Sequence, residues 1–473
     1  MSEAGTFLDR LIRIKGENNE DSDTIREMYR KLIAIAWPAA LEGLLLSLMN
    51  SFDTMMVGRL GPAAITAVGL CANPRMIMLL LAQALCVGTT AVTARRKGQD
   101  RQDAAISCLK QSLVIITAIG IAITLIGYYG AEALVKIAGA NSETVGDASL
   151  YFRIISLAFI ANCWALCICA AMRGIGKTKV TMVVNMTANV VNVFLNYCLI
   201  LGHFGFPALG VRGAAIATAI GTLVSCVLAV SVVLKKDEYL TLRPFRGFRF
   251  DRETISGLVQ IGGGSIAESV FLRVGFLING RLIAGVGTAA YATNQIVNQV
   301  SGLSFTLGDG TGSAATSLIG QSLGAGKKEK AKLYVKIVQR LSLFISVFLI
   351  LFMVLGRNML PKLFTNDPMI IWAASLCFLI LAAAVYAQNL RVILSGCLRG
   401  AGDVKFVAMI SLISVLIIRP LMTWVFCYPL NARFPHLNLG FLGPWLSFDI
   451  DTLVRTWLLI RRVNQGKWVD IKL

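Results

Sequence analysis

The sequence predicts an all-α membrane protein with twelve transmembrane helices arranged as two parallel six-helix repeats. Three observations support this fold class. Hydrophobic residues make up 56% of the 473-residue chain and charged residues only 15%, whereas about 25% of an average soluble domain is charged. Twelve long apolar windows follow one another along the chain, and matching residues recur at a constant spacing in its two halves.

Each apolar window is long enough to cross the hydrocarbon core of a bilayer, which takes about 20 residues as a helix. Glycine and proline clusters, such as Gly61-Pro62 and the segment 400–402, lie between windows or at their ends, where the chain must turn. We therefore expect twelve helices joined by short connections. The windows lie near residues 33–57, 74–94, 109–130, 150–171, 179–201, 210–234, 258–283, 292–320, 337–356, 370–396, 404–428 and 440–460.

Basic residues alternate between many and few from one connection to the next. If every second connection faces the same side as the termini, that side holds 32 of the 45 Lys and Arg residues, the other side holds 9, and four lie deep within windows. Cytoplasmic loops are enriched in Lys and Arg, so we expect a multi-pass protein of the plasma membrane with both termini in the cytoplasm. This orientation accounts for the net charge of +19, and we do not expect nucleic acid as a partner.

The two halves of the chain repeat each other. Six helices per half is an even number, so both halves cross the membrane in the same direction, and a binding cleft is expected where they meet, as in secondary transporters. Four residue pairs are each separated by 226 positions: Glu42 and Glu268, Gly61 and Gly287, Gly98 and Gly324, and Arg173 and Arg399. The expected divisions are a cytoplasmic tail (1–31), helices 1–6 (32–235), a cytoplasmic linker (236–257), helices 7–12 (258–462) and a second cytoplasmic tail (463–473).

Few acidic residues lie within the predicted spans before the last helix. They are Glu42, Asp53, Glu268 and Asp309. A carboxylate at the bilayer centre costs about 2.5–3.5 kcal/mol, so it usually faces a wet cavity, pairs with a cation or is protonated. Glu42 and Asp53 are eleven residues apart, which places them on one helix face about 16 Å apart along the axis. No basic residue within the same helix can neutralise Asp53, which favours a functional role.

The repeat is asymmetric at two polar positions. Asp53 corresponds to Asn279, which shares a helix face with Glu268, and Gln83 corresponds to Asp309. Each half also carries a polar stripe, formed in the first half by Asn185, Asn189, Asn192 and Asn196, and in the second by Gln295, Gln299, Thr306, Asp309 and Ser313. The amides in these stripes could supply oxygens to an ion, or they could serve only as hydrogen bonds between helices.

Other charged residues predict structural contacts. Arg273 could pair with Glu268 only imperfectly, and Asp451 and Arg455 are spaced as an i, i+4 ion pair. With only two histidines, and cysteines that lie within apolar runs, we expect no metal site and no cofactor.

Three segments resemble the MATE (multidrug and toxic compound extrusion) transporters. They are Trp37–Gly61, which contains the run Asn50-Ser51-Phe52-Asp53-Thr54, Gly213–Thr218 and Gly320–Gly326. Together with the twelve helices and the half-repeat, the resemblance covers about residues 30–460. It implies a V-shaped pair of six-helix lobes that exports cationic or amphipathic drugs and toxins in exchange for Na⁺ or H⁺.

The resemblance also implies an ion site in the first lobe. The family's helix 1 acid falls on Asp53, and the other positions fall on Asn192, Asn196 and Thr218, where Asn196 replaces an Asp of the family pattern. One carboxylate fewer weakens Na⁺ binding more than protonation of Asp53, which favours H⁺. In the second lobe the family's helix 7 acid falls near Glu268, about one turn early. The helix 10 acid is missing, since the chain has Gln388, Asn389 and Arg391 there.

The remaining candidate residues are assigned to substrate or proton handling: Glu42, Asn189, Glu268, Asn279, Gln295 and Asp309. Expected partners are cationic small molecules and membrane lipids, and the chain is expected to be a monomer. The nearest alternative is a lipid-linked oligosaccharide flippase of the same wider superfamily, which would need several arginines lining a central cavity. An enzyme is not expected, because no clustered nucleophile, histidine or metal set occurs in the spans. A passive channel would conduct without countertransport.

Overall fold

The computed structural model describes residues 19–236, 238–243 and 250–471, and every regular element within these ranges is helical. The first half contains α2 (Asn19–Gly58), α3 (Pro62–Leu70), α4 (Ala72–Met78), α5 (Leu80–Gly98), α6 (Gln102–Tyr129), α7 (Ala131–Ile137), α8 (Val145–Leu157), α9 (Phe159–Gly174), α10 (Thr178–Leu201) and α11 (Val211–Val233). The second half contains α12 (Arg252–Val286), α13 (Thr288–Gly324), α14 (Lys328–Gly356), α15 (Pro368–Ala401), α16 (Val404–Ser411), α17 (Arg419–Val425), α18 (Asn431–Arg433) and α19 (Leu439–Asn464). Two π-helical segments, η2 (Leu412–Ile418) and η3 (Phe426–Leu430), continue α16 and α17, and short 3₁₀ turns are η1 (Pro361–Leu363), η4 (Pro435–Leu437) and η5 (Lys467–Asp470).

All twelve predicted windows lie on helices. Within the described ranges, eight helices are long and apolar enough to span a membrane, and two more spans result if each bent helix pair is counted once. The bent pairs are Ala63–Met78 with α5, at 49°, and α8 with α9, at 51°. The other two windows lie in α13 and α19, which carry more polar residues. The all-α membrane fold predicted from the sequence is confirmed.

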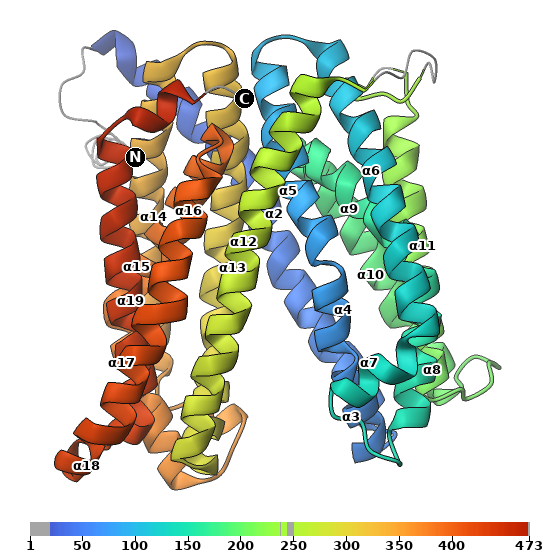
Figure 1. The fold of residues 1–473 in the computed structure, drawn as a ribbon, viewed down its shortest axis with the longest axis vertical. Helices are drawn as coiled ribbons and strands as arrows, with labels where there is room; N and C mark the ends of the chain where they lie inside the picture. The colour runs from blue at the N-terminus through green and yellow to red at the C-terminus, as the bar shows by residue number, and fades with distance from the viewer. Residues whose placement is uncertain (1–18, 237, 244–249, 472–473) are drawn as a thin grey trace, which may run out of the picture.

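The helices form two lobes that meet at one end and separate at the other (Figure 1). The N-lobe comprises α2–α11 and the C-lobe α12–α19. The start of α2 and the end of α19 lie near the closed end, whereas α3, α7 and α8 of the N-lobe and α18 of the C-lobe lie at the open end. Contacts between the lobes are made by α13 with α2 and α5, and by α12 with α5.

Two glycines allow the lobes to cross closely at the closed end. A Cβ atom on Gly98 of α5 would collide with the Gln321 carbonyl of α13, and one on Gly324 of α13 would collide with the Arg95 carbonyl of α5. These two contacts are related by the 226-residue repeat. The crossing therefore has the two-fold symmetry of the repeat, and any side chain at either glycine would push the backbones apart.

Helices extend into the segments predicted to be the two tails and the linker. Residues 1–18 of the predicted N-terminal tail, 237 and 244–249 of the linker, and 472–473 of the C-terminal tail lie outside the described residues. From Asn19 onward the chain is helical, and Ile25 and Met28 are buried in an apolar cluster with residues of α13, α14 and α15. The first helix of the N-lobe therefore also anchors to the C-lobe.

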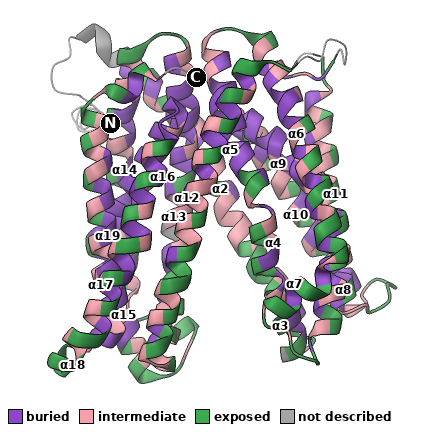
Figure 2. Ribbon diagram, in the orientation of Figure 1, coloured by how far each residue is buried: buried purple, intermediate pink, exposed green. Residues whose placement is uncertain are grey.

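Large apolar side chains are exposed along the length of many helices, where exposed and half-buried residues cover much of both lobes (Figure 2). Examples on α6 and α14 are Leu125, Phe348 and Leu355. Such extended apolar exposure would be unfavourable in water but is solvated by lipid tails in a bilayer. The outer surface therefore agrees with the membrane-spanning character of the helices.

Candidate functional site in the N-lobe

A cavity of about 490 Å³ lies within the N-lobe, bounded by α2, α10 and α11 and by the bent segments around α4 and α8. The four residues predicted to bind an ion all line it: Asp53, Asn192, Asn196 and Thr218. Asn189, assigned to substrate handling, lines the same cavity. The structure therefore brings these five side chains together: the spacing of the asparagines aligns them on one face of α10, and the packing of α2 and α11 adds Asp53 and Thr218.

A chain of hydrogen bonds joins the four predicted ion-site residues. Asn196 Nδ2 donates to Asp53 Oδ1 at 2.7 Å and to Asn192 Oδ1 at 3.4 Å, and Asn192 Nδ2 donates to Thr218 Oγ1 at 3.5 Å. Asn196 Oδ1 is buried and accepts no hydrogen bond from the described residues. An unsatisfied buried oxygen is unfavourable by about 1–3 kcal/mol, so this oxygen could bind a cation or a water molecule beside the carboxylate.

Small residues on α11 bring this helix close to the asparagine face of α10. A Cβ on Gly221 would lie 2.9 Å from Asn192 Cβ and 3.1 Å from the Ala188 carbonyl oxygen, and one on Gly213 would collide with the Leu199 carbonyl. Small residues at helix interfaces allow such close approach in membranes. The run Gly213–Thr218 therefore positions Thr218 against Asn192.

Asp53 shares its cavity with a basic residue that was not among the sequence candidates. Arg75 of α4 lines the cavity, yet no ion pair within 4 Å joins a basic side chain to Asp53 in the described part of the chain. In the sequence Arg75 lies at the edge of an apolar window, and in the structure it lies in α4, just before the bend that leads into α5. The carboxylate is therefore held by an amide and is not locked to a guanidinium.

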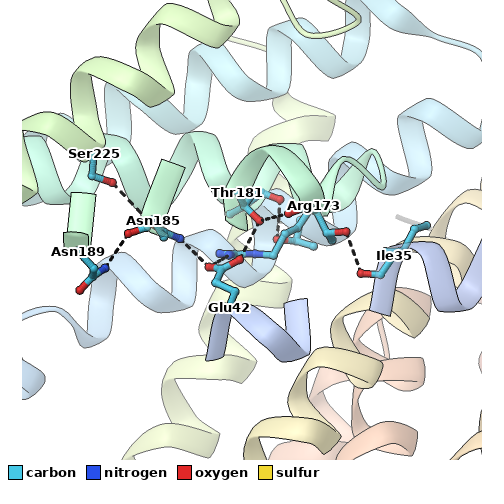
Figure 3. A network of polar contacts seen from close by, with 10 residues as sticks. Ile35, Glu42, Arg173, Thr181, Asn185, Asn189 and Ser225 are labelled. Atoms are coloured by element: carbon cyan, nitrogen blue, oxygen red, sulfur yellow. Dashed lines mark hydrogen bonds and ion pairs between the residues drawn. The ribbon is translucent and has the colours of Figure 1, made fainter. Parts of the chain in front are cut away.

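Glu42 lies beyond the cavity in a buried polar network between α2, α9 and α10 (Figure 3). Asn185 Nδ2 donates to Glu42 Oε1 at 2.6 Å and Thr181 Oγ1 donates to Oε2 at 3.1 Å, while Arg173 Nη1 lies 3.7 Å from Oε1. Asn185 Oδ1 in turn accepts from Ser225 Oγ at 3.4 Å, and the backbone carbonyl of Asn185 accepts from Asn189 Nδ2 at 2.7 Å. Glu42 is thus connected to the N-lobe cavity through Asn185, which lines it.

The C-lobe repeats the glutamate–arginine pair. Arg399 Nη2 donates to both carboxylate oxygens of Glu268 at 2.8 Å, which is the counterpart of Arg173 and Glu42. The expected imperfect partner, Arg273, instead contacts the sulfur of Met76 across the lobe interface. The sequence showed that both members of each pair recur at the same offset, but their pairing depends on helix packing.

The prediction of an ion pair between Asp451 and Arg455 is wrong, because each residue has a different partner. Asp451 pairs with Arg419 of α17, and Arg455 donates to Ser411 Oγ at 2.8 Å. The guanidinium on the neighbouring helix reaches the carboxylate more directly than the residue one turn away on α19. Both side chains of the pair are buried, so this contact fastens α17 to α19 within the C-lobe.

The other C-lobe candidates do not assemble into one site. Asn279 Oδ1 accepts from Thr423 Oγ1 at 2.6 Å, and Gln295 is exposed and donates to the Tyr291 hydroxyl of its own helix at 3.2 Å. Asp309 lines a different cavity, between the lobes, together with Arg399. The predicted stripe on α13 therefore does not form a counterpart of the N-lobe cavity.

Comparison with known proteins decides the family. A family model described as MatE matches residues 38–198 and 265–425, one segment in each lobe. The chain belongs to the MatE family. It is accordingly a membrane transporter with many spans and not an enzyme, which confirms the family that the sequence resembles.

Curated relatives match nearly the whole chain. The uncharacterized transporter YisQ of Bacillus subtilis is 26% identical over 442 residues, covering 93% of this chain and 95% of YisQ. The probable multidrug resistance protein NorM of Thermotoga maritima is 26% identical over 452 residues, covering 96% of each chain. The multidrug resistance protein PmpM of Pseudomonas aeruginosa is 27% identical over 390 residues, covering 82% of each chain.

Solved structures share the two-lobe fold. A MATE transporter crystallised in complex with MaD3S has a TM-score of 0.84 and 21% identity, covering 93% of this chain and 97% of the other. A MOP superfamily transporter from Pyrococcus furiosus also has a TM-score of 0.84 and 21% identity, covering 94% and 97%. At this level of identity the likeness confirms the fold, including the V-shaped pair of lobes.

Proposed function

We propose that this chain is a secondary antiporter of the plasma membrane that exports cationic or amphipathic small molecules, such as drugs and toxins, in exchange for H⁺ or Na⁺. The observation that carries the proposal is Asp53, a carboxylate in the wall of the N-lobe cavity that hydrogen-bonds to Asn196. The names of the Thermotoga maritima and Pseudomonas aeruginosa relatives support the substrate class. The proposed transporter is a monomer in contact with lipids, and it needs no cofactor and no nucleic acid.

In the proposed cycle, a cation that reaches Asp53 neutralises it and weakens its hydrogen bond from Asn196. This changes how α2 packs on α10 within the N-lobe. Because α2 also contacts α13 of the C-lobe, the change can reach the lobe interface. Ion binding shifts the two transport states only by the difference in its binding free energy between them, and neutralising a partly buried carboxylate supplies about a few kcal/mol.

We infer that H⁺ is the coupling ion. Na⁺ requires several oxygen ligands and gains most from carboxylates, whereas Asn196 provides a neutral amide beside Asp53. A proton needs only the Asp53 carboxylate. Ethidium transport under separate H⁺ and Na⁺ gradients distinguishes the two ions.

The proposed orientation follows from the distribution of basic residues. The start of α2, the end of α19 and the described parts of the connections rich in Lys and Arg lie at the closed end of the V. If that end faces the cytoplasm, the open end faces the outside and the structure represents an outward-open state. Substrate released from the cleft in this state would leave the cell.

Transport in proteoliposomes tests the proposed function. Ethidium accumulation is measured with the purified protein under an imposed pH gradient and, separately, under an imposed Na⁺ gradient. We expect ethidium movement driven by the pH gradient. Ethidium movement that is the same with and without either gradient would contradict antiport and favour a passive channel.

The flippase alternative is weakened by the arginines. The arginines that line the cavity between the lobes, Arg173 and Arg399, are each paired with a glutamate of the same lobe, Glu42 and Glu268. A pyrophosphate headgroup would need guanidinium groups that are free to bind it. The charges available in this cavity therefore favour a cation over an anionic lipid.

A further inference from the structure

A second cavity, of about 350 Å³, lies on the pseudo-two-fold axis between the lobes. It is lined by seven residues of the N-lobe and seven of the C-lobe, and each residue is matched by its counterpart 226 positions later. We call it the axial cavity. The matched pairs are Gln83 and Asp309, Cys86 and Gly312, Val87 and Ser313, Thr90 and Thr316, Leu166 and Val392, Ala170 and Gly396, and Arg173 and Arg399.

Only one matched pair differs in charge. The arginines Arg173 and Arg399 keep the same charge on both sides of the axis, and five other pairs are uncharged on both sides. The counterpart of Asp309 is the neutral Gln83. The charge symmetry of the lining is therefore broken by a single carboxylate.

The arginines of the axial cavity form their ion pairs with other carboxylates. Arg399 donates twice to Glu268 at 2.8 Å, and Arg173 lies 3.7 Å from Glu42, so each guanidinium has an acidic partner of its own. Asp309 makes no hydrogen bond or ion pair through its side chain to any other residue that the structure describes. Asp309 also interacts electrostatically with Arg399 and with Arg391, but neither guanidinium lies within 4 Å of its carboxylate as an ion pair.

We propose that the axial cavity binds a monovalent organic cation, with Asp309 as the anchoring residue and the Gln83 amide as a second polar contact. Both side chains are exposed to the cavity, and its volume falls within the usual range for small-molecule pockets, about 300–1,000 Å³. A carboxylate within the bilayer region is best stabilised by a cation of equal charge. This assignment deepens the proposed function, on which it rests for the substrate class, and it separates the substrate site from Asp53.

The axial cavity depends on how the lobes meet. Next to Asp309, a Cβ on Gly310 would lie 2.5 Å from the Ala40 backbone nitrogen of α2, so α13 and α2 are in close backbone contact there. One wall of the axial cavity belongs to the N-lobe and the other to the C-lobe. Movement of one lobe relative to the other must therefore change the shape of the cavity. Glu42, which contacts Arg173 of the axial cavity and Asn185 of the N-lobe cavity, lies between the two sites.

The repeat symmetry provides a stringent test. Binding of tetraphenylphosphonium to the purified full-length protein in detergent is measured at equilibrium, without an ion gradient, for wild type, Asp309→Asn, Gln83→Asp and the double variant Gln83→Asp/Asp309→Gln. We expect Asp309→Asn to weaken binding about tenfold or more, which corresponds to about 1.4 kcal/mol. The double variant moves the carboxylate to its symmetry-related position and is expected to bind within about threefold of wild type.

Two results would overturn the proposal. One is wild-type affinity in Asp309→Asn. The other is failure of the double variant to recover affinity although its thermal unfolding matches that of wild type. If affinity is lost in Asp53→Asn and kept in Asp309→Asn, the probe binds in the N-lobe cavity instead. Because no gradient is present, a protein that binds through Asp309 but does not transport would contradict the proposed function and leave the axial site intact.

Discussion

The two lobes share one repeat, yet only the N-lobe has a carboxylate on its first helix at the position of Asp53. In the N-lobe the side chain that donates to this position is Asn196, and in the C-lobe it is Thr423. The counterpart of Asp53 is Asn279, whose oxygen accepts from a threonine hydroxyl. Both lobes retain the buried glutamate–arginine pair.

This difference separates two roles of intramembrane charge. The paired charges are present in both lobes, at Glu42–Arg173 and Glu268–Arg399, and contact neighbouring helices wherever the repeat occurs. Asp53, which accepts a hydrogen bond from the Asn196 amide, has Asn279 and no carboxylate as its counterpart in the C-lobe. We infer that the pairs are chiefly structural and that ion coupling belongs to the N-lobe.

The largest expected effect comes from removing the N-lobe charge. Asp53→Asn should abolish gradient-driven ethidium transport, because the neutral amide cannot bind a proton or Na⁺. Asn279→Ala, at the matching position of the C-lobe, should leave transport within about threefold of wild type. Proteoliposome assays with equal amounts of inserted protein compare the two variants. Equal loss in both would contradict the assignment of coupling to one lobe.

Asn196→Asp is expected to lower the rate of ethidium transport less than Asp53→Asn does, but to change which ion drives transport. The variant places a second carboxylate beside Asp53, which raises the negative charge of the site and favours Na⁺. Transport by the variant should become dependent on Na⁺, whereas wild type follows the pH gradient. If the variant keeps the ion preference of wild type, Asn196 does not determine the coupling ion.

The paired charges should affect stability more than coupling, and unequally in the two lobes. Glu268→Gln leaves the Arg399 guanidinium without its partner, and breaking a buried pair costs about 3–5 kcal/mol. Glu42→Gln should cost less, because the Arg173 contact is longer, at 3.7 Å, and the glutamine can still accept from Asn185. Thermal unfolding in detergent measures both.

The matched control for these variants is Glu27→Gln. Glu27 forms an exposed ion pair with Lys31 on α2, and solvent screens such pairs, so the unfolding temperature of Glu27→Gln should match that of wild type. Equal destabilisation by Glu42→Gln and Glu268→Gln would show that the longer contact is not the weaker one.

The smallest expected effects are those of the two threonines. Thr218→Val removes an acceptor that lies 3.5 Å from Asn192, and Thr423→Val removes the 2.6 Å bond to Asn279. Hydrogen bonds between membrane helices contribute about 0.6 kcal/mol on average. We expect Thr423→Val to lower thermal stability slightly without changing transport, and Thr218→Val to weaken ion dependence about twofold. A larger transport loss in Thr423→Val would give the C-lobe a part in coupling.

Much of the fold and of the N-lobe site could be predicted from the sequence because it depends on regular spacing. Helix periodicity places Asn192 and Asn196 on one face, and the 226-residue offset identifies the repeat. Both features are patterns of residue spacing along the chain and do not depend on how the helices pack. The composition of the windows likewise predicts spanning helices, since the bilayer requires about 20 apolar residues per helix.

Features that depend on how helices pack could not be read from spacing. Arg75 lines the cavity from α4, next to the bend between α4 and α5, and residue spacing does not predict this bend. In the C-lobe the partner of Asn279 is Thr423, one position beyond the residue that the offset predicts, and the π-helical segment η2 lies just before it. A π-helical turn accommodates an extra residue, so η2 shifts the register of α17.

Proton release on substrate binding tests the central account most directly. The purified protein in weakly buffered detergent solution is mixed with ethidium, and the change in pH is recorded for wild type and for Asp53→Asn. If substrate and proton exclude each other through Asp53, wild type should release protons on binding ethidium and Asp53→Asn should release none while still binding it. Equal proton release from both proteins would contradict the role of Asp53 as the coupling group.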